Sequence, residues 1–204
     1  MKQALFPHKR KTDEPLSSEA VQKELSRLCD RDALPKTEVA TAKLFPSVEK
    51  HFRSAIDREM KMPCIRTPYL YMSDEGFLIV FTVLYTLFRA SCKEFFAKAE
   101  ESGEHVFLIF EGTTDISVDG VSDALMLSER TVCTLSSIAK ASGFWLDITA
   151  SGNLLRLSFS FVRFRAVPLS SYSCSEDFIL DKMHRAFQLF LCEGGNAFDS
   201  DSHK

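Results

Sequence analysis

A run of twelve uncharged residues, FLIVFTVLYTLF at positions 77–88, constrains the fold of this 204-residue chain more than any other feature. A membrane span needs about 20 such residues, so this run does not cross a bilayer. A helix that is apolar on every side is enclosed by protein all round. A buried strand also fits the β-branched residues, but the length and the absence of Gly or Pro within the run favour a helix over residues 75–100. The second half of that helix is expected to be amphipathic.

The charge balance excludes several classes of protein. Lys and Arg number 25 and Asp and Glu 28, which gives a formal net charge of −3, and 45% of the residues are hydrophobic. A disordered chain would have fewer apolar residues and a larger net charge. The balance also gives no basic surface for nucleic acid or anionic membranes.

No apolar stretch follows the basic N-terminal residues, as a signal peptide would require, so we expect a cytoplasmic protein.

The cysteine spacing predicts no metal site. No two cysteines form a CxxC pair, and none has a His at the spacing of a zinc ligand. The expectation is six reduced and mostly buried thiols, at positions Cys29, Cys64, Cys92, Cys133, Cys174 and Cys192.

Apolar residues recur at helical spacing in four further segments. They are residues 17–29, 46–60, 123–142 and 177–192. In the second segment Pro46 is expected in the first turn, Asp57 on the polar side, and Pro63 beyond the end. Gly143 is expected to cap the third segment.

The remaining segments read as strands and turns. Residues 64–71 follow Pro63 and contain Pro68, and they predict an edge strand or an extended connection. Residues 106–110 predict a central strand, and residues 112–120 are rich in turn formers. A hairpin is expected from strands at 144–149 and 155–161 joined by Ser151-Gly152-Asn153. This order predicts an α+β two-layer sandwich, in which helices cover one face of a mixed sheet.

The domain boundaries follow from the same order. Residues 1–40 are expected to form a flexible arm and a short helix, residues 41–168 the α/β sandwich, and residues 169–204 a C-terminal helix and a polar tail. Length alone favours about one domain plus an extension.

Residues 44–165 resemble the ATP-binding domain of sensor histidine kinases, the GHKL or Bergerat fold. The segment VLYTLFRAS resembles the N-box helix of that family, V-L-x-N-L-L-x-N-A. The segment EGTTDI follows the strand HVFLIF, where the family has D-x-G-x-G-I. The segment LSSIAKASGFWLDITASGNLLRLSFSF resembles the closing helix, glycine and terminal hairpin of the family. The resemblance implies a Bergerat-type sandwich, and the helices expected at residues 17–29 and 177–192 are extra N- and C-terminal additions to it.

The departures from the family pattern bear on function. In the family, the N-box Asn binds the magnesium that bridges the ATP phosphates, and Thr86 and Ala90 stand at the matching positions. Ala has no ligand atom, so that metal role cannot be carried over. Glu111 stands where the family's Asp receives the adenine amino group, and Thr113 and Asp115 replace its glycines. The glycine-rich loop that would cradle phosphates has no counterpart.

Several polar residues remain candidates with two interpretations each. Glu111 is either an adenine-reading carboxylate or an ordinary acid at a strand end. Asp115, Asp119 and Asp123 are either a cation-binding cluster or solvated loop acids, and their spacing does not match a calcium loop. His51 is either a phosphate acceptor or a plain helix histidine.

These observations predict a degenerate histidine-kinase-like ATPase domain without catalytic residues. We expect it to act as a protein-interaction or regulatory module in bacterial two-component signalling, with a signalling protein or a second copy as partner. No metal or cofactor is expected. The alternative is a nucleotide-binding kinase or phosphotransferase with diverged motifs, in which Glu111, Asp115 and Asp119 would contact Mg-ATP. An unrelated α+β binding domain or small enzyme is a third hypothesis.

Overall fold

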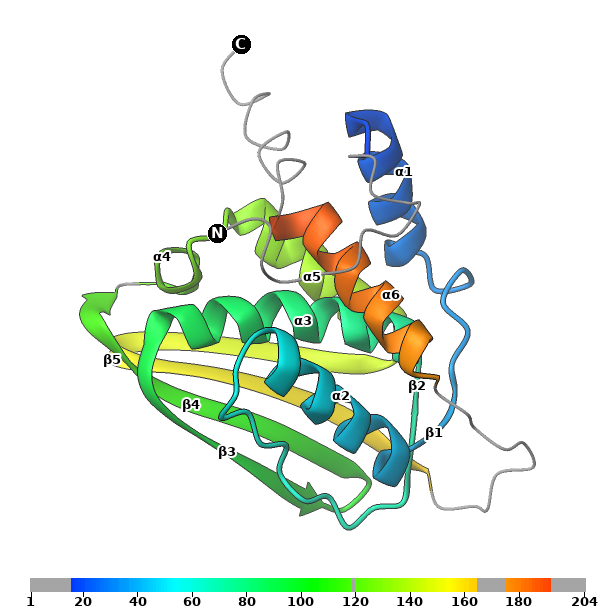
Figure 1. Ribbon diagram of the computed structural model, residues 1–204, viewed down its shortest axis with the longest axis horizontal. Helices are drawn as coiled ribbons and strands as arrows, with labels where there is room; N and C mark the ends of the chain where they lie inside the picture. Colours follow the sequence, from blue (N-terminus) through cyan, green and yellow to red (C-terminus); the bar gives the residue numbers. More distant parts are fainter. Residues whose placement is uncertain (1–15, 119, 165–174, 192–204) are drawn as a thin grey trace.

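The computed structural model describes residues 16–118, 120–164 and 175–191. In chain order the helices are α1 (Ser18–Cys29), α2 (Thr41–Ala55), α3 (Asp74–Ser91), α4 (Val121–Leu125), α5 (Glu129–Ala141) and α6 (Glu176–Ala186), and a π-helical turn, Phe187–Leu191, follows α6. The strands are β1 (Thr37–Ala40), β2 (Tyr69–Met72), β3 (Cys92–Ser102), β4 (His105–Val118) and β5 (Phe144–Phe164). Helices gather on one side of the sheet, which confirms the predicted α+β sandwich (Figure 1).

The strands pair in the order β1-β2-β5-β4-β3, and the described pairings are all antiparallel. The sheet is therefore antiparallel, whereas a mixed sheet was expected. Two neighbouring parallel strands would need a crossover connection that returns the chain to the end of the sheet at which the first strand began. Instead, the connection over residues 56–68 runs back past α2 and leads into β2 from the opposite end (Figure 1).

Helix α3 forms the centre of the core, as its apolar sequence predicts. The side chains of Phe77, Phe81 and Tyr85 are fully buried, and their rings stack in succession at centroid distances of 5.2 and 5.5 Å. The Ser73 hydroxyl accepts a hydrogen bond from the Gly76 N–H and caps the helix. The rings of this helix also meet aromatic residues of α2 and the sheet: Phe52, Phe110 and Phe159.

The N-terminal turn of α3 lies very close to the end of α5. A Cβ atom at Gly76 would lie 1.7 Å from the Ser142 hydroxyl oxygen, so the contact requires a glycine. The Ser73 N–H also donates to the Ser142 carbonyl at 2.8 Å. This end of α3 is therefore fixed against α5 by the backbone itself.

Helix α3 ends at Ser91, and the predicted continuation to residue 100 is wrong. Residues 92–102 form β3, which pairs with β4 up to Ser102 and His105, and Gly103 turns the chain with a φ of +59°. Lys, Glu and Ala favour a helix here, but propensity is weak and tertiary contacts override it. Phe95 packs its ring on Tyr85 and Phe88, and the many charges suit the exposed edge of a sheet.

Strand β4 is longer than predicted, because residues 112–118 continue it instead of forming turns. The ladder to β5 is regular up to Thr113 and Leu154, and an irregularity follows before Val118 meets Gly152. At Gly112 and Thr113, strand partners on both sides supply the backbone hydrogen bonds that a turn would have made internally.

The hairpin predicted around Ser151-Gly152-Asn153 is confirmed. The β5 run is continuous, but the rings of Phe144 and Phe161 lie only 5.5 Å apart. A straight strand of that length would separate them by about 55 Å. The run therefore folds back on itself at Gly152, whose φ is +58°, and Figure 1 shows its two yellow arms side by side.

Two predicted helices have different bounds. The segment 123–142 is divided into α4 and α5 by Met126, which has a φ of +52°, and Gly143 follows α5 with a φ of +87°, as expected for a cap. Helix α2 begins at Thr41 rather than near Pro46 and ends at Ala55. Asp57 thus lies beyond the helix, and it is buried rather than on the polar side.

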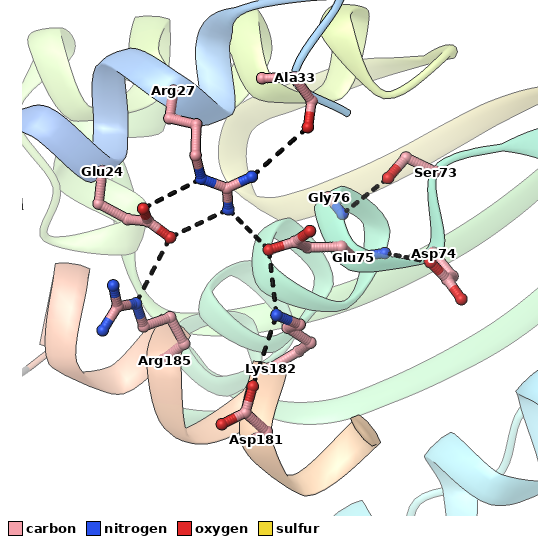
Figure 2. Close-up of polar contacts among 10 residues, drawn as sticks. All are labelled: Glu24, Arg27, Ala33, Ser73, Asp74, Glu75, Gly76, Asp181, Lys182 and Arg185. Atoms are coloured by element: carbon pink, nitrogen blue, oxygen red, sulfur yellow. Dashed lines mark hydrogen bonds and ion pairs between the residues drawn. The ribbon is translucent and has the colours of Figure 1, made fainter. Parts of the chain in front are cut away.

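Helices α1 and α6 are held on α3 by a network of ion pairs (Figure 2). Glu75 of α3 receives Arg27 of α1 at 2.7 Å and Lys182 of α6 at 3.1 Å. Glu24 of α1 receives Arg27 at 3.0 Å and Arg185 of α6 at 3.5 Å. The extra N- and C-terminal helices predicted from the sequence are therefore held on the helical side of the molecule. The predicted arm, in residues 1–15, and the predicted polar tail, in residues 192–204, lie outside the described residues.

The sheet face that points away from the helices, here called the open face, carries most of the large exposed apolar side chains. Tyr71, Phe96, Trp145 and Leu154 are 41–61% exposed and stand on it. Within the described ranges, no helix has the length and apolar character that a membrane crossing requires.

Candidate functional site

The C-terminal half of α3 is where the family resemblance places a metal and a nucleotide. Thr86 is half-buried, and its hydroxyl oxygen has no hydrogen-bond partner among the described residues. Ala90 is exposed one turn further on. Neither side chain brings a carboxylate or an amide, the oxygen ligands that magnesium prefers in proteins.

Helix α4 lies against this end of α3. The Ser91 hydroxyl donates to the Ala124 carbonyl at 2.7 Å, and Ala124 and Leu125 are buried. The same short helix contacts β4 and β5. Protein side chains therefore occupy space directly beside Ser91, at the end of the helix that resembles the N-box.

Glu111 lies in the middle of β4, opposite Phe96 of β3 and Arg156 of β5. Its neighbour Phe110 packs under α3, and side chains alternate along a strand, so Glu111 points to the open face. The Arg156 guanidinium pairs with its carboxylate at 3.2 Å. Glu111 is thus directed away from Thr86 and α3.

Glu111 and Asp115 are four residues apart on one strand, which corresponds to about 13 Å. The structure does not bring them together through other elements, and Asp115 is ion-paired with Lys93. Asp119 lies outside the described residues, and Asp123 stands in the first turn of α4. Among the described residues no three His, Cys, Asp or Glu side chains are grouped as a metal site would require. The roles of Glu111, Asp115 and Asp119 stay predictions.

A hollow of about 570 Å³ opens beside Glu111 on the open face. The exposed side chains of Phe96 and Leu154 and the Glu111–Arg156 pair contribute to its walls. Gly112, which also lines it, is required by the close approach of β3, because a Cβ there would lie 2.6 Å from the Cys92 sulfur. Burial raises the pKa of the Cys92 thiol to about 11, so this sulfur stays protonated and unreactive.

A buried polar cluster, which the sequence did not predict, lies at the same end of α3. Asp57 accepts a hydrogen bond from the Tyr85 hydroxyl at 2.8 Å and an ion pair from Arg89 at 3.0 Å. Burial, together with the Asp57 carboxylate, raises the pKa of Tyr85 above its usual value, so the phenol stays a donor. The guanidinium also lies over the Phe95 ring at 5.0 Å. The sequence held one indication of this cluster: Tyr85 and Arg89 are four residues apart, so they lie on the same side of a helix.

His51 does not meet the requirements of an accessible phosphate acceptor. It is 6% exposed, and its Nε2 atom has no hydrogen-bond partner among the described residues. Burial lowers its pKa, so the ring is neutral in the folded protein. The interpretation as a structural histidine on α2 fits this position.

No family model matches the sequence, and no curated protein is similar to it at a significant level. Solved structures do match. Among them is the Acinetobacter baumannii histidine kinase AdeS, which is 13% identical. The match covers 72% of this chain and 79% of that chain, with a TM-score of 0.52. The chain has a histidine-kinase-like fold. At this identity the likeness concerns the fold alone, and the residues at the site decide what the fold does here.

Proposed function

We propose that this chain is a histidine-kinase-like ATPase domain that no longer catalyses phosphotransfer and that acts as a protein-interaction or regulatory module in bacterial signalling. The observation that carries the proposal is the direction of Glu111. An adenine-reading carboxylate would have to face the helical side of the sheet, whereas Glu111 faces the open side and is paired with Arg156.

Two further observations support the loss of nucleotide chemistry. Thr86 and Ala90 stand where an asparagine would hold magnesium, and α4 packs beside the end of α3. A regulatory module needs a surface for a partner. The open face offers one, because Phe96 and Leu154 line the same hollow there, and apolar exposure gathered on a protein surface marks sites of association.

The test is thermal unfolding with and without millimolar Mg-ATP or Mg-ADP. We expect the midpoint to stay unchanged. A ligand at about 100 times its dissociation constant would add roughly 2.7 kcal/mol and raise the midpoint of a domain of this size by about 5–10 °C. A rise of that size would contradict the proposal and favour a diverged nucleotide-binding kinase. Glu111→Ala and Asp115→Ala would then show whether these carboxylates contact the nucleotide.

A further inference from the structure

A second hollow, of about 580 Å³, lies between α2 and the connection that leads to β2. Its volume is within the range of about 300–1,000 Å³ that is usual for small-molecule sites. It does not include the candidate residues on α3 and β4. The lining includes Phe45, Glu49, Lys50, Arg53, Met62 and Cys64.

The floor of this hollow is apolar. Phe45 and Met62 are 4% and 7% exposed, and Pro46, Pro63 and Ile65 complete the apolar lining. Such a surface takes up a hydrocarbon or aromatic group, because burial of apolar area is favourable at about 25 cal/mol per Å².

Two polar side chains of the lining are already engaged with the protein. One oxygen of Glu49 accepts the Met62 N–H at 2.9 Å, and the Thr41 hydroxyl donates to the Thr67 carbonyl at 2.7 Å. Glu49 thereby also ties the connection to α2. These bonds give the hollow a fixed wall.

Arg53 and Lys50, the two cations at the rim, still have N–H groups that can donate to a ligand. The Arg53 side chain is 57% exposed, lies 3.5 Å from Glu49, and donates from Nε to the Arg58 carbonyl. A guanidinium has five N–H donors, so several remain available. Lys50, one turn away on the same side of the hollow, is 65% exposed and pairs with Glu176.

We propose that this hollow binds a small organic anion, with an apolar body on the floor formed by Phe45 and Met62 and an acidic group at Arg53. A guanidinium is well suited to a carboxylate or sulfonate, because it donates two parallel hydrogen bonds. The site is independent of whether the domain binds a nucleotide.

Cys64 provides a local reporter for the test, and Cys133 a matched reference. Both thiols are exposed, but only Cys64 lines the hollow. The probe is 8-anilinonaphthalene-1-sulfonate, an aromatic sulfonate. The rate of alkylation of each thiol by iodoacetamide is measured by peptide mass spectrometry. At about 80% occupancy, we expect Cys64 to react about fivefold more slowly and Cys133 at an unchanged rate.

Two variants locate the acidic group of the probe. Arg53→Gln is expected to raise the probe concentration needed for half protection by about tenfold, the effect of losing a charge-assisted hydrogen bond. Arg53→Lys should lie between this variant and the wild type. Arg156→Gln, which alters the cation beside the other hollow, should leave protection of Cys64 unchanged. Three outcomes would overturn the proposal. The probe could leave the alkylation rate of Cys64 unchanged, it could slow Cys64 and Cys133 equally, or it could protect Cys64 in Arg53→Gln at the same concentration as in the wild type.

Discussion

The two ends of α3 are fixed by two polar clusters that are built differently. At the N-terminal end, Glu75 and Glu24 share three cations, and the side chains are 16–36% exposed. At the C-terminal end, Asp57 alone receives both Tyr85 and Arg89, and its side chain is 5% exposed. The first cluster spreads charge over many partly hydrated groups, whereas the second places one carboxylate in the interior.

The difference shows why the number of ion pairs is a poor guide to stability. A partly exposed pair is worth about 0–1 kcal/mol, because water competes for both charges. A buried charge that loses its partner is much more costly, because nothing replaces the lost interaction. We therefore expect the cluster with fewer members to be the more sensitive one.

The strongest test of this comparison removes the buried acid. Asp57→Ala removes the acceptor of the buried Tyr85 hydroxyl and the carboxylate that pairs with Arg89, whose guanidinium keeps its hydrogen bond to the Cys92 carbonyl. We therefore expect a loss of about 3 kcal/mol in the free energy of unfolding. Urea denaturation measures it. The matched control is Glu59→Ala, since Glu59 is 82% exposed and lies 3.8 Å from the same arginine. The control should change stability by less than about 0.5 kcal/mol. A loss below 1 kcal/mol for Asp57→Ala would contradict the argument.

The N-terminal cluster should respond less. Glu75→Gln keeps the shape and removes the charge that joins Arg27 to Lys182, and we expect a loss of about 1 kcal/mol. In about 1 M salt this loss of stability should be smaller, because the Debye length is then roughly 3 Å and the charges of the cluster are screened from one another. Asp181→Asn is the control, because Asp181 is 62% exposed and touches the same lysine. If Asp181→Asn lost as much stability as Glu75→Gln, the place of a carboxylate within the network would be unimportant.

The smallest expected effect concerns pH and His51, which lies near Lys50 and Glu176. Burial lowers its pKa below the ordinary value of 6.5, so the unfolded chain binds the proton more readily. The contribution of His51 to stability is therefore complete above pH 6.5 and is lost as the pH falls below it. Arg27 lowers the pKa of Glu24 and Lys50 lowers the pKa of Glu176, so these two carboxyl groups titrate below the pH range in which His51 acts.

Thermal unfolding between about pH 5 and pH 7.5 measures how steeply stability changes with pH. His51→Gln should flatten it, although the variant itself is less stable at neutral pH because of altered packing. An unchanged slope in the variant would mean that another group causes the pH dependence.

The sequence predicted those parts of the fold in which a local pattern and the tertiary environment agree. The all-apolar run of α3, the hairpin at Gly152 and the cap at Gly143 are such cases. It failed at β3, where Lys, Glu and Ala favour a helix but pairing with β4 and the packing of Phe95 decide. It also missed β1, a strand of four residues whose partner lies some thirty residues away.

The candidate site was less predictable than the fold. Glu111 was found from its place after a strand, but the side of the sheet to which it points depends on strand register, and a shift of one residue reverses it. The Asp57 cluster depends on where α2 ends, which is the least certain property of a helix read from its sequence.

The only tryptophan of the chain, Trp145, stands 51% exposed on the open face, while the interior aromatic cluster consists of phenylalanine and tyrosine. The molecule therefore carries its tryptophan fluorophore on the surface proposed for a partner and not in the core. Its emission reports the polarity of that surface. A partner that covers the open face would shift the tryptophan emission to shorter wavelength without any label. Loosening of the core would change the tryptophan emission little, because Trp145 does not pack there.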